Sequence, residues 1–263
     1  MKKVIKIALV VTVLSLALAA VTLFASGTNE PSANIERYNL TFKDSVYISY
    51  AVSFDNVPDG AECGILVWKE AQSAYTVDSE GYTKITEVSS YASFGETRCN
   101  VYNFKQISAT EFTSDIYAVA FINDGGNYTY SSLSKYSVLQ YAYNKLGISE
   151  LGTPTDDEGL VALLNALLDY GAAAQVYFGE NTERLANAQY YMLSVYGGTL
   201  PDLSSGGLYL EGLKLLITAP EQKDGKQFVA WVDKDGNVIG TDPILEYTVP
   251  TANSAITAKY SEN

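Results

Sequence analysis

The sequence predicts a mainly β protein with some α-helix, in which an antiparallel β-sandwich with appended helices precedes a small second β unit. Three observations lead to this fold class. Apolar and polar residues alternate in the first half of the chain, apolar residues then recur every three to four positions, and a glycine- and serine-rich stretch precedes a last group of strand-like segments. Alternation is typical of half-buried strands, and the wider spacing is typical of one helix face.

Residues 1–25 are predicted to be a targeting segment. Lysines stand near the N-terminus, and residues 7–24 form an uncharged apolar run followed by small residues. This order is that of a secretory signal peptide, cleaved after Ala25 or after Ala19. An uncleaved membrane anchor is the alternative, because the run approaches the roughly 20 residues that cross a bilayer. Both interpretations predict export, with membrane contact only through this segment if it stays uncleaved.

The following part of the chain is strand-like. Strands are predicted at residues 46–54, 64–68, 82–88, 99–104, 116–122 and 128–131. Turn residues separate them, including a hairpin signal at Asp124-Gly-Gly-Asn127. Several short strands with turns between them are typical of an antiparallel, immunoglobulin-like (Ig-like) β-sandwich.

Helices are predicted after the strands. Residues 139–146 and 160–178 carry apolar residues at helical spacing, and acidic residues precede the second stretch, where the helix dipole favours them. Residues 182–195 show the same register, which predicts a third helix. We therefore assign residues 34–196 to the β-sandwich with its C-terminal helices.

A linker and a second β unit are predicted to complete the chain. Residues 197–207 are rich in glycine and serine with one proline, which is typical of a linker. Residues 208–263 contain four further strand-like segments, at 214–219, 228–232, 245–249 and 255–260.

Composition excludes several classes of function. The chain has 30 acidic and 17 basic residues, a net charge of −13, and no histidine. An acidic protein repels the phosphate backbone, so we expect no nucleic-acid partner. Without an imidazole, Ser–His–Asp, Cys–His and HExxH sites are impossible.

The C-terminal part resembles an internalin-type B repeat, also called the Listeria–Bacteroides repeat. Four elements of that family's pattern recur in order: Gly225-Lys-Gln-Phe-Val-Ala-Trp231, Asp235-Gly-Asn237, Tyr247-Thr-Val249 and Ile256-Thr-Ala-Lys-Tyr260. Ala230 departs from the pattern, since the family usually has glycine there. The resemblance implies a small β-grasp-like extracellular module of bacterial surface proteins, without catalysis.

The middle part is similar to an uncharacterised module of secreted Firmicutes proteins. Tyr136-Ser-Val138, Tyr141-Ala142 and the stretch from Leu168 to Phe178 carry this second resemblance. It implies a β-sandwich followed by helices and a surface or secreted location, with no known activity.

The two cysteines, Cys63 and Cys99, are predicted to form a disulfide. An even number of cysteines in an exported protein favours a bridge, and both lie in strand-like segments of one domain. Two free thiols are the alternative. Two cysteines without histidine make no zinc site.

No residues are assigned to catalysis, to a metal or to a cofactor. Paired carboxylates suffice for a glycoside hydrolase, but nothing in the sequence selects two of the 30 acids. Acidic turns such as 124–127 leave calcium binding open as an alternative. The chain has 21 tyrosines, and Tyr128 and Tyr130 are the candidate ligand-binding residues, because tyrosine rings stack on sugars and pack at interfaces.

We therefore expect an exported, non-catalytic bacterial surface or secreted protein that acts as a binding, adhesive or structural module. Its expected partner is an extracellular protein or a glycan. A carbohydrate-binding protein that uses tyrosine faces and a small carboxylate-based glycoside hydrolase are the two alternatives.

Removal of the first 19 to 25 residues is the first testable prediction. The basic start, the apolar run and the small residues after it are the cleavage signals. Intact mass of protein collected from the culture medium should lack this segment. A full-length chain found only in the membrane fraction would establish the anchor instead.

Overall fold

A computed structural model describes residues 30–42, 45–149 and 152–261. The predicted targeting segment, residues 1–25, lies outside the described residues. Residues Pro31–Asn263 form one compact unit.

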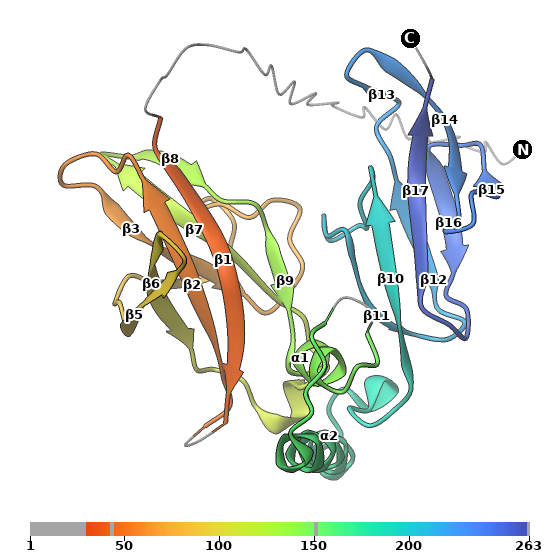
Figure 1. The fold of residues 1–263 in the computed structure, drawn as a ribbon, viewed down its shortest axis with the longest axis horizontal. Coiled ribbons are helices and arrows are strands. Elements are labelled where there is room, and N and C mark those ends of the chain that lie inside the picture. Colours follow the sequence, from red (N-terminus) through yellow and green to blue (C-terminus); the bar gives the residue numbers. More distant parts are fainter. Residues whose placement is uncertain (1–29, 43–44, 150–151, 262–263) are drawn as a thin grey trace, which may run out of the picture. The chain divides into compact units, whose positions relative to one another are not determined.

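Two antiparallel sheets make the β-sandwich (Figure 1). The first sheet has the order β1-β2-β6-β5: β1 (Ser32–Thr41), β2 (Tyr47–Asp55), β6 (Thr97–Phe104) and β5 (Ser90–Phe94). The second has the order β4-β3-β7-β8: β4 (Thr83–Ile85), β3 (Glu62–Trp68), β7 (Ile116–Asp124) and β8 (Asn127–Tyr130), with β9 (Ser134–Tyr136) also on β7. The predicted mainly β class, with a sandwich and appended helices, is confirmed.

The sandwich core follows the alternation of the strands. Ile48, Tyr50 and Val52 of β2 face inward and are fully buried, and Tyr102 and Phe104 of β6 lie beside them. Side chains on one strand point alternately to opposite faces, so the intervening residues lie on the outer face. This alternation is the pattern from which the strand was predicted.

Both cysteines are free thiols in the structure, which corrects the predicted bridge. Cys63 has the parity of Ile65 and packs against the core between the sheets. Cys99 has the opposite parity to Tyr102 and therefore lies on the outer face of its sheet, where it is buried. A disulfide needs Cβ atoms that point toward one another. Cys63, on β3 of the second sheet, faces the inner side of the first sheet, whereas Cys99 lies on the outer side of the first sheet, so that sheet separates them.

Two α-helices follow the sandwich, as predicted. α1 (Val138–Lys145) begins where the Ser137 hydroxyl accepts the N–H of Gln140. α2 (Glu158–Phe178) begins at Asp157, whose carboxylate accepts two backbone N–H groups, and ends at Gly179 with φ of 70°. Ser and Asp caps satisfy donors that a helix start leaves unpaired, and glycine adopts the left-handed end without strain. By length and apolar composition, α2 is the one helix of the described part that meets the requirement for a membrane span.

A buried glutamine fixes the C-terminal end of α2. The Gln175 amide donates to the carbonyls of Asn181 and Arg184 and to the hydroxyl of Thr113, and its oxygen accepts the N–H of Ala186. η1 (Ala109–Glu111) and η2 (Thr182–Arg184) are 3₁₀ turns on either side of this contact. The glutamine therefore holds the chain after α2 against the loop before β7.

The prediction of a third helix at residues 182–195 is wrong. Only η2 is helical there, and β10 (Tyr190–Tyr196) is a strand. β10 pairs with a strand at each edge, and its two faces pack on two different cores, so side chains on both faces are buried. A strand buried on both faces has apolar residues at three-to-four spacing by coincidence, which is the source of the error.

The C-terminal β unit is built around β10. Its sheet has the order β11-β10-β17-β14-β13: β11 (Gly206–Leu210), β17 (Ser254–Tyr260), β14 (Lys226–Val232) and β13 (Gln222–Lys223), with β15 (Val238–Gly240) paired to β14. β12 (Lys214–Thr218) and β16 (Ile244–Thr248) form a separate pair. β10 and β17 are parallel, and Trp231 of β14 is fully buried in this unit's core.

Residues 197–207, predicted as a linker, form packed structure. Leu200 is buried in the core of the C-terminal unit, and the backbones of Thr199 and Thr218 exchange two hydrogen bonds. Asp202 bonds to side chains of the sandwich. The segment therefore joins the two β units through contacts as well as through the chain.

Gly171→Ala should destabilise the fold although alanine favours helices. A Cβ at residue 171 would lie 2.6 Å from the ring of Phe112 and 3.0 Å from Cβ of Ala186, and both neighbours are buried. Overpacking costs about 1–3 kcal/mol, more than the roughly 1 kcal/mol gained in helix propensity. Chemical denaturation measures the difference.

The exposed Ala173, two residues along α2, supplies the control. Ala173→Gly should lose about 1 kcal/mol through propensity alone. A Gly171→Ala variant more stable than the wild type would mean that α2 does not pack closely on Phe112.

Candidate functional site

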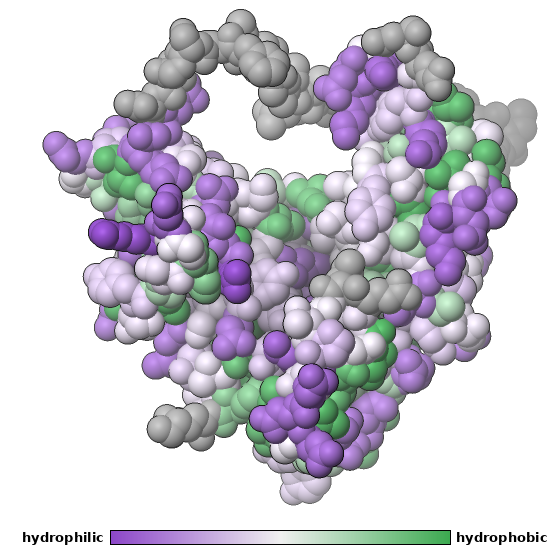
Figure 2. Space-filling model, viewed as in Figure 1, coloured by the Kyte–Doolittle hydropathy of each residue, from purple (hydrophilic) through white to green (hydrophobic). Residues whose placement is uncertain are grey.

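A cavity of about 760 Å³ opens between the edge of the sandwich and the start of the C-terminal sheet. Its lining comes from β1, β9, α1, β10 and residues 203–207. We call it the serine groove, because five of the lining residues are serines: Ser132, Ser134, Ser194, Ser204 and Ser205. Figure 2 shows a hollow between the surface over β1 and β9 and the surface over β10 and β11.

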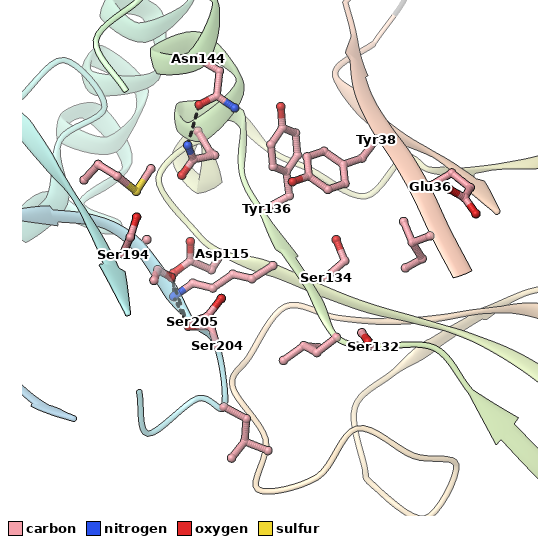
Figure 3. Close-up of a pocket in the computed structure, with 18 of the residues that line it drawn as sticks. Glu36, Tyr38, Asp115, Ser132, Ser134, Tyr136, Asn144, Ser194, Ser204 and Ser205 are labelled. Carbon is pink, nitrogen blue, oxygen red and sulfur yellow. Dashed lines mark hydrogen bonds and ion pairs between the residues drawn. The ribbon is translucent and has the colours of Figure 1, made fainter. Parts of the chain in front are cut away.

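Two tyrosine rings cover one wall of the serine groove (Figure 3). The ring centroids of Tyr38 and Tyr136 are 4.0 Å apart, with the planes tilted by 44°. Tyr136 is buried, whereas Tyr38 is 42% exposed. Burial raises the pKa of both phenols, so both stay neutral hydroxyl groups at physiological pH. The groove therefore offers one accessible aromatic ring.

Amide side chains of α1 line the end of the groove beside the tyrosines. The Asn144 oxygen accepts hydrogen bonds from the Gln140 amide, at 2.8 Å, and from the Ser149 hydroxyl. With its oxygen taken, Asn144 turns its NH₂ toward Tyr136, and that hydrogen bond partly opposes the rise in the tyrosine pKa. These hydrogen bonds therefore fix the orientation of the Gln140 and Asn144 side-chain amides on α1.

Ser134 places a buried hydroxyl in the groove without a partner. Its Oγ is inaccessible and forms no hydrogen bond with any residue that the structure describes. Figure 3 shows Ser134 on β9, between Ser132 and Tyr136. Buried polar groups nearly always have a partner, so this hydroxyl is an exception beneath the surface of the groove wall.

A buried ion-pair cluster bounds the groove on the side of the C-terminal unit. Lys135 of β9 is only 9% exposed, and its ammonium lies 2.7 Å from Asp202 and 3.4 Å from Asp115. It also donates to the hydroxyls of Ser204 and Tyr209. Because Lys135 belongs to the sandwich and Asp202 to residues 197–207, the cluster fixes the width of the groove.

Lys135 and Asp202 are both ionised at neutral pH. Burial lowers the pKa of Lys135, but Asp115, Tyr209 and Asp202 raise it more, so it lies above its ordinary value. Burial raises the pKa of Asp202, but the Lys135 ammonium and the Ser204 hydrogen bonds lower it more, so it lies below its ordinary value. The groove wall therefore holds one cation against two carboxylates, and Lys135 presents no free positive charge to a ligand.

The sequence-predicted ligand residues lie elsewhere. Tyr128 and Tyr130 of β8 stack with ring centroids 5.7 Å apart, and both are half-buried on the outer face of their sheet. The Tyr130 hydroxyl accepts the N–H of Val77 from the loop that covers them. Neither residue lines the serine groove. Whether they bind a ligand stays a prediction.

The acidic turns behave as turns in the structure. The Asn123 side chain accepts the N–H of Gly126 within the β7–β8 hairpin. Among the described residues, no group of three or more acidic, cysteine or histidine side chains is placed to hold a metal ion.

The comparisons with known proteins concern the C-terminal part. Residues 191–263 match the family model described as the divergent InlB B-repeat domain. The predicted resemblance to an internalin-type B repeat is confirmed. The match begins within β10, so it includes residues 197–207 and the groove residues Ser204 and Ser205. B-repeat domains are typical of surface and secreted bacterial proteins.

No curated protein and no solved structure matches the chain. The resemblance of the middle part to a module of secreted Firmicutes proteins stays a prediction.

Asp202→Ala should lower the free energy of unfolding by about 3 kcal/mol at pH 7, because it leaves the buried Lys135 with a single carboxylate at longer range. A lowered carboxyl pKa stabilises the fold above the unfolded value of about 3.9, and that stability is lost as the pH falls through the folded pKa. The difference between variant and wild type should therefore shrink below about pH 4. Urea denaturation at several pH values measures it.

Lys214→Met is the matched control. Lys214 pairs with Glu246 at the same 2.7 Å distance, but both side chains are more than 60% exposed. Loss of such an exposed pair should leave the stability nearly unchanged. Equal effects of the two substitutions would show that burial of the Lys135 cluster has no energetic consequence.

Proposed function

We propose that the chain is an exported, non-catalytic binding module whose ligand occupies the serine groove. The B-repeat match supports a surface or secreted setting. The observation that carries the proposal is the groove itself, about 760 Å³ in volume and lined by hydroxyl and amide groups together with the exposed ring of Tyr38. Ligand sites combine a concave surface with a few oriented polar groups.

The groove suits an uncharged or basic ligand. Its only cation, Lys135, is held by two carboxylates, and the remaining acid, Glu36, is exposed at the rim. The chain as a whole carries a charge of −13. An acidic ligand would be repelled at long range, whereas a neutral or basic one would not.

The carboxylates near the groove support binding over hydrolysis. Asp115 and Asp202 both contact the Lys135 ammonium, and Asp202 also accepts hydrogen bonds from Ser204 and Tyr117. A glycosidase acid needs a raised pKa, whereas the pKa of Asp202 is lowered. We therefore keep the hydrolase only as an outcome of the test.

A glycan is the second candidate ligand, since the Tyr38 ring is accessible at the mouth of the groove. The flat face of an aromatic ring packs well against a sugar ring, and the serine hydroxyls and amides are donors and acceptors of the kind that sugars need. This candidate keeps the expectation of a tyrosine face but moves it from Tyr128 and Tyr130 to Tyr38.

Tyr38→Ala should weaken ligand binding about tenfold, because the ring is the accessible aromatic contact of the groove. The purified exported chain is screened on a glycan array and against a library of random peptides, and the affinity of each hit is measured by calorimetry. Tyr91→Ala is the control, since Tyr91 is 80% exposed on β5 and does not line the groove.

Equal loss in the two tyrosine variants would place the ligand outside the serine groove. Turnover of a polysaccharide, abolished by Asp115→Asn, would overturn the non-catalytic proposal.

A further inference from the structure

We propose that the serine groove holds an extended peptide segment of a partner protein, which adds as a strand to the outer edge of β9. This rests on the proposed function and names the class of its ligand. Strand addition needs an edge whose backbone groups are unpaired and accessible, and a place for alternate side chains of the peptide.

The hairpin between β7 and β8 sets the direction of every backbone group on β7. Asp124 and Asn127 flank the two-residue turn, and such a pair exchanges both of its N–H···O bonds. Hydrogen-bonded pairs recur at every second residue, so the N–H and C=O groups of the even-numbered residues of β7 point toward β8 and β9. The 2.9 Å bond from the Ser131 N–H to the Ala120 carbonyl confirms this parity.

The same alternation shows in which direction the backbone N–H and C=O groups of β9 point. Ser134 and Tyr136 stand opposite Ala118 and Ile116, so their N–H and C=O groups point to β7. Adjacent residues of a strand point to opposite edges, so the N–H and C=O groups of Leu133 and Lys135 point away from β7. Both residues line the serine groove. Outside the β7–β9 ladder, no backbone hydrogen bond joins either of them to another described residue.

Of the two sandwich strands that border the groove, β1 and β9, only β9 has an edge that can accept another strand. β1 also borders the groove, but it has a bulge between Ile35 and Arg37, and the charged Glu36 and Arg37 are exposed there. Bulges and charges of this kind protect an edge against pairing. β9 has no bulge, and the side chain of Lys135 is turned away into its ion-pair cluster.

The volume of the groove, about 760 Å³, provides room for a strand. Its opposite wall begins with Gly206 and Gly207, and the lack of a side chain at residue 207 leaves space there for the Lys135 ammonium and the Tyr209 hydroxyl. A peptide on β9 would then find the accessible ring of Tyr38 for one of its side chains.

The test compares two substitutions of Leu133 on a peptide selected from a random dodecapeptide library. Leu133→Pro removes an N–H that points into the groove, and proline is tolerated at such edge positions. It should weaken binding about tenfold through one lost hydrogen bond and its unpaired acceptor. Leu133→Ala keeps the N–H and should change the affinity by less than about threefold. Equal loss in both variants would overturn strand addition.

Hydrogen exchange supplies a second readout that does not depend on the proline variant folding. The amides of Leu133 and Lys135 should exchange at least about tenfold more slowly when the selected peptide is bound to the wild-type chain. The amide of Tyr209 in β11, which the register directs to β10, is an internal reference. Unchanged exchange at Leu133 and Lys135 with peptide bound would overturn the proposal.

The outcomes separate the two proposals. Glycan binding that Tyr38→Ala weakens and Leu133→Pro leaves intact would overturn the peptide and retain the serine groove as the binding site. Binding of either ligand without any effect of Tyr38→Ala, Leu133→Pro or Leu133→Ala would overturn both.

Discussion

The placement of the serine groove depends on one buried cation. Lys135 extends from β9 of the sandwich to Asp202 in the segment that leads into β11, and Asp115 lies 3.4 Å from the same ammonium. A charge that has lost its hydration must stay paired, because separating the partners leaves an uncompensated buried charge. The pairing therefore resists opening between β9 and residues 197–207, and the groove keeps its two walls at one separation.

β10 supplies the apolar counterpart of that ionic contact. Tyr190 and Met192 contribute to the core of the sandwich and helices, while Leu193 and Val195 contribute to the core around Trp231. Successive side chains of a strand point to opposite faces, so one strand serves two cores. The B-repeat match at residues 191–263 begins inside this strand, which also packs on the sandwich.

The elements that the sequence predicted correctly are those whose burial follows a simple period. β2 and β7 have the expected strand signals, and α2 has an acidic start, a periodic stripe and a terminal glycine. The elements that were missed are the ones around the groove. β1 exposes polar residues on both sides, β11 begins with two glycines, and β10 is buried on both faces. Each lacks a period because its surroundings, rather than its own amphipathicity, decide its conformation.

The residues of the proposed site could not be predicted from the sequence for a related reason. Tyr38, Lys135 and Asp202 come from three distant parts of the chain, and none has a local motif. Tyr128 and Tyr130 were chosen for ring chemistry alone; they lie outside the serine groove, and whether they bind a ligand stays a prediction. Only the pairing of strands shows which backbone groups are left over.

The pairing of β9 with β7 determines which backbone groups the proposed site offers to a ligand. The groove's one cation is held by two carboxylates, so specificity has to come from hydrogen bonds and shape. The groups that stay available are the outward N–H and C=O groups of Leu133 and Lys135 and the exposed part of the Tyr38 ring. Backbone groups at strand spacing are complementary to another backbone, whereas the ring also suits a sugar. The unpaired edge of β9 is thus the feature that favours a peptide over a glycan.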